Sequence, residues 1–501
     1  MTSQKRPRGF AGHAATYAIG NVARRVVGFV MLPIYTRFLS PADYGVIGLL
    51  TFALYVFEPL FGARLGAAIP KFYAEAPDAR ARRAVIWSAI GFTGVVSAVS
   101  VAMIIALRGL GSTLLFGDRQ FAFALGLYAV TFLSTPIEQA GMAYLRIRQR
   151  SGLFLGFSMV KLVLQITLNV LLVVIWRDGV LGVVLSAVIS SGILSIATTI
   201  YVVAKEPPAF DWDITRRMVR FCWPLWLSGI AGLYIGSSGN LYLRVFGSLS
   251  AVGLLSLALR FASVVGTLIW TPFYQHWEPM SFQYYREEGG QRKFQVAFIV
   301  ISALMFAGGL GISIFAAPVI RVMAAKSFYA ASAAVPIIVF GGVLTCLRQF
   351  FNFSFFVTGN TNIHSLCQYG TALIITVTYV LLIPRFGLMG AAVAQTLALT
   401  INFFYVRILS RRYYDPGFSL VPMGLFALIG TVAYLCSNAI LHPASLALDM
   451  LVRSFVMLVA VALMALVAVR EIRGMAGPAI EALPWPLDRL GRIQFGRQSG
   501  N

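Results

Sequence analysis

Six basic side chains fall inside segments that are otherwise apolar enough to lie in a lipid bilayer. They are Arg24, Arg25, Arg64, Lys161, Arg260 and Arg348, and the same segments hold only two carboxylates, Glu58 and Glu138. A charge near the centre of a bilayer costs about 2.5–3.5 kcal/mol, so such residues face water, a counter-ion or a ligand. Two carboxylates cannot neutralise six cations. The surplus predicts a wet cavity for an anion, and the planar donor fork of arginine suits phosphate or pyrophosphate best.

The composition supports a bilayer location for these segments. Of the 501 residues, 58% are hydrophobic and 12% are charged, and the mean hydropathy is +0.80. The apolar residues come in blocks of about 20, the length that crosses a bilayer as a helix. Blocks such as 84–107 are apolar on every face, which disfavours a barrel of alternating strands. We therefore expect an all-α polytopic membrane protein.

The hydropathy predicts about 14 transmembrane helices. The predicted segments are 11–36, 43–68, 84–107, 119–144, 153–176, 180–203, 218–243, 250–277, 294–318, 329–357, 363–383, 387–409, 419–441 and 450–470.

The basic residues outside these segments or near a segment end alternate between the two sides of the predicted bilayer. Of the 40 Lys and Arg residues, 25 fall on the side of the N-terminus and nine on the opposite side. Cytoplasmic connections carry such an excess of basic residues. Both termini are therefore predicted in the cytoplasm, and the net charge of +22 is a sign of topology rather than of nucleic-acid binding.

Two short matches indicate an internal repeat with a spacing of about 208 residues. The stretch IWRDGVLG at 175–182 agrees with IPRFGLMG at 383–390 in four of eight positions. Tyr35 and Arg37 agree with Tyr242 and Arg244, and each pair is followed by a glycine that opens the next helix, Gly45 or Gly253. Six predicted helices separate equivalent points. An even number preserves orientation, so we expect parallel repeats related by a pseudo-twofold axis along the membrane normal.

This repeat predicts two six-helix lobes with two peripheral helices. The predicted parts are a cytoplasmic N-terminus at 1–10, an N-lobe at 11–204, a cytoplasmic linker at 205–217, a C-lobe at 218–410, two extra helices within 411–470, and a basic cytoplasmic tail at 471–501.

The intramembrane arginines differ in how strongly they point to a ligand. Arg24 and Arg25 are about 100° apart on a helix, so one of the two must point away from any single cavity. Arg64 is one turn from the cytoplasmic end of its segment, where it could equally reach the headgroups. Arg260 and Arg348 lie in the middle of their segments, which favours a role in binding.

The remaining polar residues allow two readings each. Lys161, Gln165 and Asn169 form a polar stripe that either lines a cavity or makes hydrogen bonds between helices. Glu58 and Glu138 each lie close to a proline and either carry a coupling proton or sodium ion or neutralise a neighbouring arginine.

Neither the cysteines nor the histidines form a recognisable site. Each of the four cysteines lies in an apolar run without CxxC spacing, and the four histidines are scattered. We therefore expect no metal site, no cofactor and no enzymatic activity.

The stretch GNVARRVVGFVMLPIYTRFLSPADYGVIGL at 20–49 resembles the first two helices of Wzx-type polysaccharide flippases of the multidrug/oligosaccharidyl-lipid/polysaccharide exporter superfamily. The segment from Leu32 to Gly45 is its most specific part. The resemblance implies alternating access between two six-helix lobes in the bacterial inner membrane. The implied cargo is an undecaprenyl-pyrophosphate-linked oligosaccharide repeat unit for O-antigen, capsule or exopolysaccharide, moved from the cytoplasmic to the periplasmic leaflet.

The resemblance also implies roles and partners. It assigns the pyrophosphate to Arg24 or Arg25 and to Arg260, whereas Arg64, Lys161 and Arg348 rest on the residue pattern alone. The candidate energy sources are a proton or sodium gradient and the membrane potential. The candidate partners are membrane lipids, a polysaccharide polymerase and a chain-length regulator.

Four alternatives remain open. A lipid II flippase would differ only in cargo. A cation-coupled multidrug antiporter is disfavoured because such relatives favour acidic residues in the first helix, where this chain has arginines. A polymerase or ligase would need catalytic groups outside the membrane, and the outer connections are short and poor in carboxylates. A scaffold without transport would leave the arginines unexplained.

Overall fold

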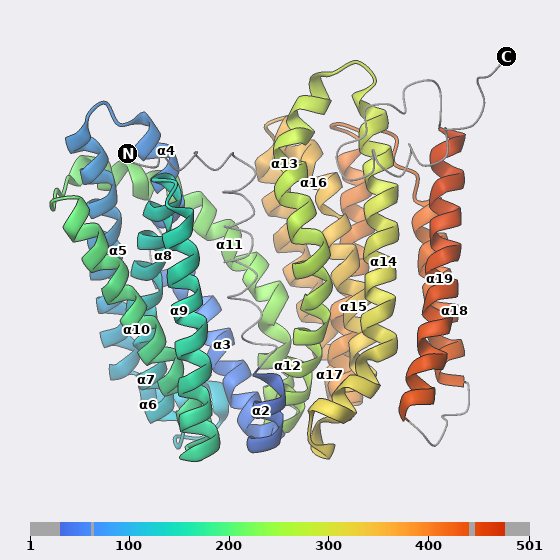
Figure 1. Cartoon of the computed structure of the whole chain (residues 1–501), viewed down its shortest axis with the longest axis horizontal. Helices are drawn as coiled ribbons and strands as arrows, with labels where there is room; N and C mark the ends of the chain where they lie inside the picture. The colour runs from blue at the N-terminus through green and yellow to red at the C-terminus, as the bar shows by residue number, and fades with distance from the viewer. Residues whose placement is uncertain (1–30, 62–64, 440–445, 476–501) are drawn as a thin grey trace, which may run out of the picture. The chain divides into compact units, whose positions relative to one another are not determined.

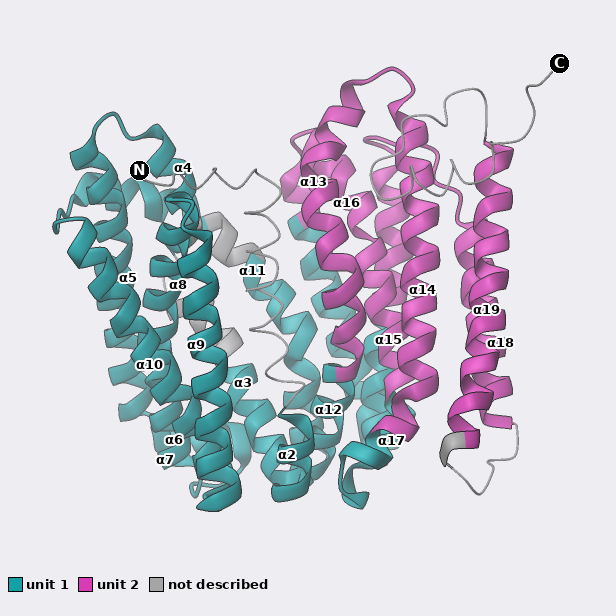
Figure 2. Cartoon of the chain, viewed as in Figure 1, with its two compact units in different colours: residues 1–260, 320–334, 365–398 teal, residues 261–319, 335–364, 399–501 magenta. Residues whose placement is uncertain are grey.

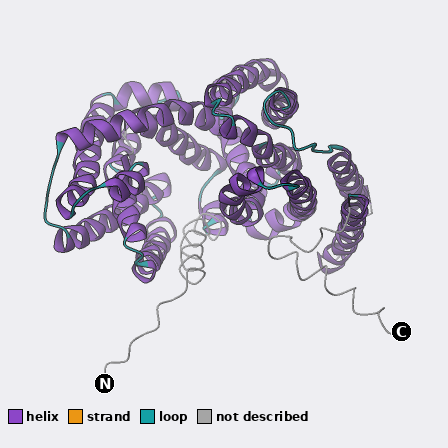
Figure 3. Cartoon of the chain, turned by 90° about the horizontal axis from the view of Figure 1, so that it is seen from above, coloured by secondary structure: helices purple, strands orange, loops and turns teal. Residues whose placement is uncertain are grey.

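The computed structural model describes residues 31–61, 65–439 and 446–475 (Figure 1). Across these ranges the secondary structure is helical and contains no strand, as Figure 3 shows. Nine helices in the same ranges are long and apolar enough to cross a membrane. The chain is therefore an all-α, multi-pass membrane protein, as predicted, whereas the count of 14 helices remains a prediction.

The helices follow the predicted segments closely. Their bounds are α2 Leu32–Phe38, α3 Pro41–Phe61, α4 Ile69–Glu75, α5 Ala79–Ala106, α6 Arg108–Phe116, α7 Ala122–Ala129, α8 Thr131–Ile147, α9 Ser151–Asn169, α10 Gly179–Lys205, α11 Trp212–Phe246, α12 Leu249–Val265, α13 Thr271–Arg286, α14 Gly290–Met323, α15 Ala331–Leu347, α16 Gln349–Val357, α17 Thr361–Ser410, α18 Val421–Ala439 and α19 Leu446–Gly474. Short π-helices, Val170–Ile175 and Gly266–Trp270, continue α9 and connect α12 to α13.

Two helices lie where the sequence analysis expects only connections. These are α4, before the span of α5, and α6, directly after it. Both are short, with seven and nine residues, so hydropathy over a span-length window does not detect them. The 50-residue helix α17 contains a break at Gly387, where φ is 53° and ψ is −125°. This break lies at the predicted boundary between the segments 363–383 and 387–409.

The chain forms two compact units (Figure 2). Unit 1 contains residues 1–260, 320–334 and 365–398, and unit 2 contains 261–319, 335–364 and 399–501. Unit 1 has a core of buried side chains from α4, α5, α8, α10 and α11, among them Ile69, Val85, Tyr144, Val202 and Met218. Unit 2 is rich in packed rings, including Trp277, Phe294, Phe298, Phe350, Phe351 and Phe418. The division into two six-helix lobes remains a prediction.

Within unit 1, α3 and α12 cross at two glycines with no room for a side chain. A Cβ on Gly45 would lie 2.0 Å from the carbonyl oxygen of Leu249, and a Cβ on Gly253 would lie 1.9 Å from that of Pro41. The two contacts are equivalent under the repeat. Gly253 lies 208 residues after Gly45, and Leu249 lies 208 residues after Pro41. Small residues let helix backbones approach closely in a membrane, where van der Waals packing rather than the hydrophobic effect holds helices together.

The same ends of these helices are capped in the same way. The hydroxyl of Ser40 accepts a hydrogen bond from the backbone N–H of Asp43 at 3.1 Å, and the hydroxyl of Ser248 accepts one from that of Ala251 at 3.2 Å. A serine at this position satisfies one of the backbone donors that a helix start leaves free. α3 and α12 therefore begin at equivalent positions, because the two capping serines are 208 residues apart.

The two arginines of the sequence match also make equivalent contacts in unit 1. Arg244, near the end of α11, donates to the carbonyl oxygen of Phe116 at 2.8 Å, and Arg37, in α2, donates to that of Val322 at 3.5 Å. Phe116 ends α6, and Val322 is one residue from the end of α14. Basic side chains stabilise helix C-termini by bonding to the last free carbonyls.

The sequence match at 175–182 and 383–390 likewise has a structural counterpart. Gly179 and Gly387 both adopt a positive φ, at 55° and 53°. Gly182 and Gly390 both lie close to a carbonyl oxygen earlier in the chain. A Cβ added to Gly182 would lie 3.0 Å from the carbonyl oxygen of Leu172, and one added to Gly390 would lie 2.3 Å from that of Leu382. These similarities agree with the predicted repeat.

In unit 2, an ion pair holds the connection between α17 and α18. Arg407 donates to Asp415 with two nitrogens, at 2.9 and 3.1 Å, and also to the carbonyl oxygen of Phe418 at 3.1 Å. Partial burial acts to raise the pKa of Asp415, but the hydrogen bonds from Arg407 and from the backbone N–H of Gly417 outweigh it and lower the pKa below the ordinary 3.8.

The Asp415 pair should stabilise the protein only where its carboxyl is ionised. A carboxyl with a lowered pKa in the folded state contributes stability above its unfolded pKa and loses it as the pH falls through the folded pKa. Asp415→Asn should therefore unfold at a lower temperature than the parent at pH 7, and the difference should shrink as the pH falls below about 4. Thermal unfolding of both proteins in detergent across this range measures it, and a constant difference would contradict the assignment.

The glycine crossing predicts a strong effect of one methyl group. Gly253→Ala places a Cβ against the backbone of α3, which cannot move aside as a flexible side chain could. We expect the unfolding temperature in detergent to fall by roughly 2–5 °C, as for a loss of about 2–3 kcal/mol in a chain of this length. Gly236→Ala on α11 is the matched control, since an added Cβ there meets nothing within 4 Å. Equal unfolding temperatures for the two variants would exclude a tight crossing.

Candidate functional site

Four of the eight predicted site residues cannot be placed. Arg24, Arg25 and Arg64 lie outside the described residues, and Glu58 lies in the part of α3 whose side chains are outside the description. Their assignment remains a prediction. Glu138, Lys161, Arg260 and Arg348 are described.

Lys161 and Glu138 form an ion pair between α9 and α8 in unit 1. The ammonium of Lys161 donates to Oε2 of Glu138 at 2.5 Å. The side chain of Glu138 is 3% exposed and that of Lys161 is 21% exposed. The sequence analysis considered an arginine as the partner of Glu138, whereas the structure shows the lysine. In this arrangement the charge of Lys161 is already balanced by a protein carboxylate.

Asn169, the last polar residue of the α9 stripe, makes hydrogen bonds between helices. The side-chain oxygen of Asn169 accepts from the hydroxyl of Tyr35 at 2.8 Å and from that of Ser186 at 2.9 Å. Its amide donates to the carbonyl oxygen of Gln165 at 2.7 Å. Asn169 therefore joins α2, α9 and α10, which fits the interhelical alternative for this position.

Arg260 lies beside the N-terminal motif of the chain. Its guanidinium carbon is 5.9 Å from the ring centroid of Tyr44, and the ring of Tyr44 also packs edge-on against Phe328 at 5.9 Å. Cations favour the face of an aromatic ring because of its quadrupole. Tyr44 belongs to the segment from Leu32 to Gly45 that carries the family resemblance. The sequence analysis did not list it as a site residue, although the motif contained the signal.

Arg348 lies in unit 2, between α15 and α16. It is 5% exposed, and its guanidinium donates to the side-chain oxygen of Asn402 on α17. A neutral amide accepts the hydrogen bond without cancelling the charge. Of the three described cations, Lys161 is thus paired with a carboxylate, Arg348 is buried beside an amide, and Arg260 is half-buried beside a tyrosine.

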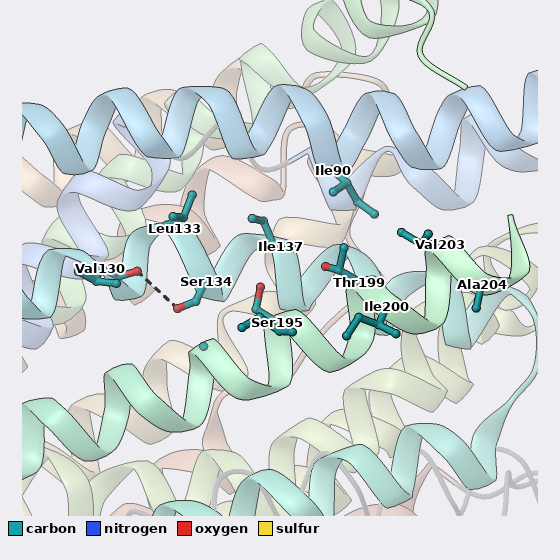
Figure 4. Close-up of a pocket in the computed structure, with 12 residues that line it drawn as sticks. Ile90, Val130, Leu133, Ser134, Ile137, Ser195, Thr199, Ile200, Val203 and Ala204 are labelled. Atoms are coloured by element: carbon teal, nitrogen blue, oxygen red, sulfur yellow. Dashed lines mark hydrogen bonds between the residues drawn. The ribbon is translucent and has the colours of Figure 1, made fainter. Parts of the chain in front are cut away.

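Unit 1 also holds an apolar groove of about 620 Å³ between α5, α8 and α10 (Figure 4). Its lining is mostly aliphatic, and its polar members are Ser134, Ser195 and Thr199. The hydroxyl of Ser134 is already hydrogen-bonded to the hydroxyl of Ser191 at 2.7 Å. The described lining contains no charged residue, so the groove suits hydrocarbon and cannot stabilise a phosphate.

The described part of the chain contains no group of three His, Cys, Asp or Glu side chains that could hold a metal ion.

The sequence profile described as Polysaccharide biosynthesis protein matches residues 12–285, which is more than half of the chain. The chain belongs to this family. The match covers α2 to α12 and most of α13, and so it includes the glycine crossing, the Lys161–Glu138 pair and the contact between Arg260 and Tyr44.

Solved structures with the same fold are transporters. The structure titled "Lipid II flippase MurJ, inward closed conformation" has a TM-score of 0.75 at 12% identity and covers 91% of this chain and 99% of its own. An inward-facing multidrug resistance MATE family transporter of the MOP superfamily scores 0.62 at 14% identity, with coverage of 79% and 98%. The MATE multidrug transporter DinF-BH in complex with R6G scores 0.58 at 16% identity, with coverage of 83% and 99%. At such identities the likeness establishes the fold alone.

No curated protein sequence matches the chain significantly.

The Lys161–Glu138 pair predicts a rescue by double substitution. Lys161→Met leaves the nearly buried carboxylate of Glu138 without its cation, which typically costs about 3–5 kcal/mol. We expect a clear fall in unfolding temperature for this variant and recovery of most of it in Lys161→Met/Glu138→Leu, because removing both charges removes the unpaired one.

The matched control for this cycle is Arg385→Met, which removes an exposed charge on α17. An unfolding temperature for the double variant as low as that of Lys161→Met would show that the two side chains do not stabilise the fold as a pair. Transport measured on the stabilised double variant then tests separately whether the pair also serves function.

Proposed function

We propose that this protein flips undecaprenyl-pyrophosphate-linked oligosaccharide repeat units from the cytoplasmic to the periplasmic leaflet of a bacterial inner membrane. The match of residues 12–285 to the polysaccharide biosynthesis family carries the proposal. The fold supports it, because it is shared over nearly the whole of both chains with a structure titled as a lipid II flippase. The product would supply the synthesis of O-antigen, capsule or exopolysaccharide.

The charges within the membrane suit a pyrophosphate cargo. Arg260 and one of Arg24 and Arg25 would bind the pyrophosphate, because guanidinium groups donate two parallel hydrogen bonds to phosphate oxygens. Tyr44 would orient Arg260 through its ring face. In this proposal Arg64 and Arg348 contribute positive potential, Lys161 contributes little because Glu138 balances its charge, and the polyprenyl tail stays in the lipid.

Movement of the cargo would follow from a change between inward-open and outward-open states. The pyrophosphate favours whichever state surrounds it with cations, and exchange of the two states carries it across the bilayer. No covalent bond changes in this process, so the proposal is of a transporter and not an enzyme. A proton or sodium gradient, or the membrane potential, would supply the energy. Glu58 and Glu138 remain the candidate carriers of a coupling proton or sodium ion.

A lipid II flippase is the second candidate. The structure of a lipid II flippase, with a TM-score of 0.75, favours it, since lipid II shares the pyrophosphate chemistry required of the site. A multidrug antiporter fits less well. The MATE transporter has a lower TM-score of 0.62, and a drug cargo does not account for a surplus of buried cations. The polymerase, the chain-length regulator and the membrane lipids stay proposed partners.

Arg260→Ala should abolish transport without loss of the protein. Removing one guanidinium from a pyrophosphate site costs several charge-assisted hydrogen bonds, so we expect export to fall by a factor of at least about 100. Arg260→Lys should retain a partial activity, because a lysine keeps the charge but not the fork. The measurement is surface polysaccharide in a deletion strain carrying each variant, with protein level in the membrane as the reference.

Arg385→Ala is the control, since Arg385 is an exposed arginine on α17 that is predicted to face the periplasm. Undiminished export in Arg260→Ala would reject the proposed role of this arginine. In the deletion strain itself, repeat units should accumulate on the cytoplasmic leaflet. Units that reach the periplasm and stay unpolymerised would favour a polymerase, and loss of cell-wall synthesis would favour lipid II as the cargo.

A further inference from the structure

Unit 2 contains a second pocket, chemically unlike the apolar groove. It has a volume of about 280 Å³ and lies between α13 and α16. Its lining combines aromatic rings with an acid, an amide and two hydroxyls: Tyr274, Trp277, Glu278, Ser281, Phe282, Gln349, Phe353 and Phe356. Nothing in the proposed transport of a pyrophosphate uses these residues.

The inner walls of the pocket are held rigidly by other rings. Trp277 stacks on Phe273 with a centroid distance of 5.7 Å and an interplanar angle of 14°, and it meets Phe294 edge-on at 5.2 Å. Phe353 packs against Phe294 and Phe282, each at 5.1 Å. Such packing restricts ring motion, so the pocket presents apolar surface that does not need to be ordered on binding.

Among the polar groups of the pocket, the carboxylate of Glu278 offers an acceptor and the amide of Gln349 offers a donor. The carboxylate of Glu278 accepts a hydrogen bond from the hydroxyl of Tyr274 at 3.3 Å and has further lone pairs. The side-chain oxygen of Gln349 already accepts from the amide of Asn352 at 2.7 Å. The NH₂ group of Gln349 is therefore the part of this amide that can serve a ligand.

This combination matches the chemistry of a sugar ring. Each sugar hydroxyl can donate to a carboxylate and accept from an amide, and the C–H faces of the ring can pack on aromatic side chains. A phosphate fits poorly, because the pocket lining holds an acid and no basic residue. The volume is close to the lower end of ordinary ligand pockets, which suits one monosaccharide better than a chain.

We propose that this pocket binds one neutral sugar residue of the oligosaccharide, which rests on the proposed function of the protein. An organic cation is the rival ligand, since aromatic faces and a carboxylate also attract ammonium groups. The N–H donor of Gln349 favours the sugar over the cation. An organic cation has no acceptor for this N–H group, and the partial positive charge of the group repels it.

The test is saturation-transfer NMR on the full-length protein in detergent micelles. The probes are methyl glycosides of a hexose, a 6-deoxyhexose and an N-acetylhexosamine, with tetramethylammonium as the cation. We expect at least one glycoside to receive saturation. Its signal should fall at least about fivefold in Gln349→Met and in Phe356→Ala, because the first removes the donor and the second removes a ring that is 38% exposed.

Each variant has a matched control in unit 2. Gln275→Met removes an exposed glutamine of α13 outside the pocket lining, and Phe455→Ala removes a 68% exposed ring on α19. Both should leave the signal unchanged. Unfolding temperatures within a few degrees of the parent show that each variant is folded.

Glu278→Gln separates the two ligand classes. An amide oxygen still accepts from a hydroxyl, so binding of the glycoside should weaken only a few-fold, whereas a cation would lose its counter-charge. Saturation of tetramethylammonium alone, abolished in Glu278→Gln, would overturn the proposal. So would absence of saturation for every glycoside, or a glycoside signal that survives in both Gln349→Met and Phe356→Ala.

These outcomes are distinct from failure of the proposed function. Glycoside binding in a protein whose deletion leaves every surface glycan intact would reject the transport function and retain the pocket. Loss of export in Arg260→Ala together with no glycoside binding would retain the transport function and reject the pocket.

Discussion

The close approach of α3 and α12 is the constraint on which the arrangement of unit 1 depends. Gly45 and Gly253 each lie against a backbone carbonyl of the other helix, so the two helices can only meet where neither carries a side chain. The crossing brings the N-terminal motif to the helix that bears Arg260 and so places Tyr44 beside its guanidinium. In a bilayer, where apolar side chains gain little by leaving lipid, such backbone proximity is a principal source of specificity.

The cost of charge in a low dielectric explains the surroundings of the described cations. Lys161 is matched with a carboxylate, whereas Arg348 has an amide that solvates its charge without removing it, and Arg260 has an aromatic face. These environments differ in how much positive potential they leave for an anion. A lysine paired with a carboxylate leaves little.

The groove of unit 1 and the pocket of unit 2 have chemically different linings. The groove of unit 1 is lined by aliphatic side chains and suits hydrocarbon, whereas the pocket of unit 2 joins aromatic walls to Glu278 and Gln349. Membership of the polysaccharide biosynthesis family gives both observations a common context. A glycolipid presents hydrocarbon, phosphate and sugar hydroxyls, each of which requires a different kind of surface.

The sequence by itself determined the membrane class, the approximate ends of the helices and the points at which two distant parts of the chain resemble each other. Hydropathy over about 20 residues is a local property, so a helix such as α10 and the break at Gly387 could be read from it. The surplus of buried basic residues could likewise be counted. The partners of these residues could not be predicted, because they come from helices that are distant in the sequence. Only the tertiary structure showed that Lys161 pairs with Glu138, that Arg348 bonds to Asn402, and that α13 and α16 line one pocket. Periodicity gives the face of a helix, and packing decides what that face meets.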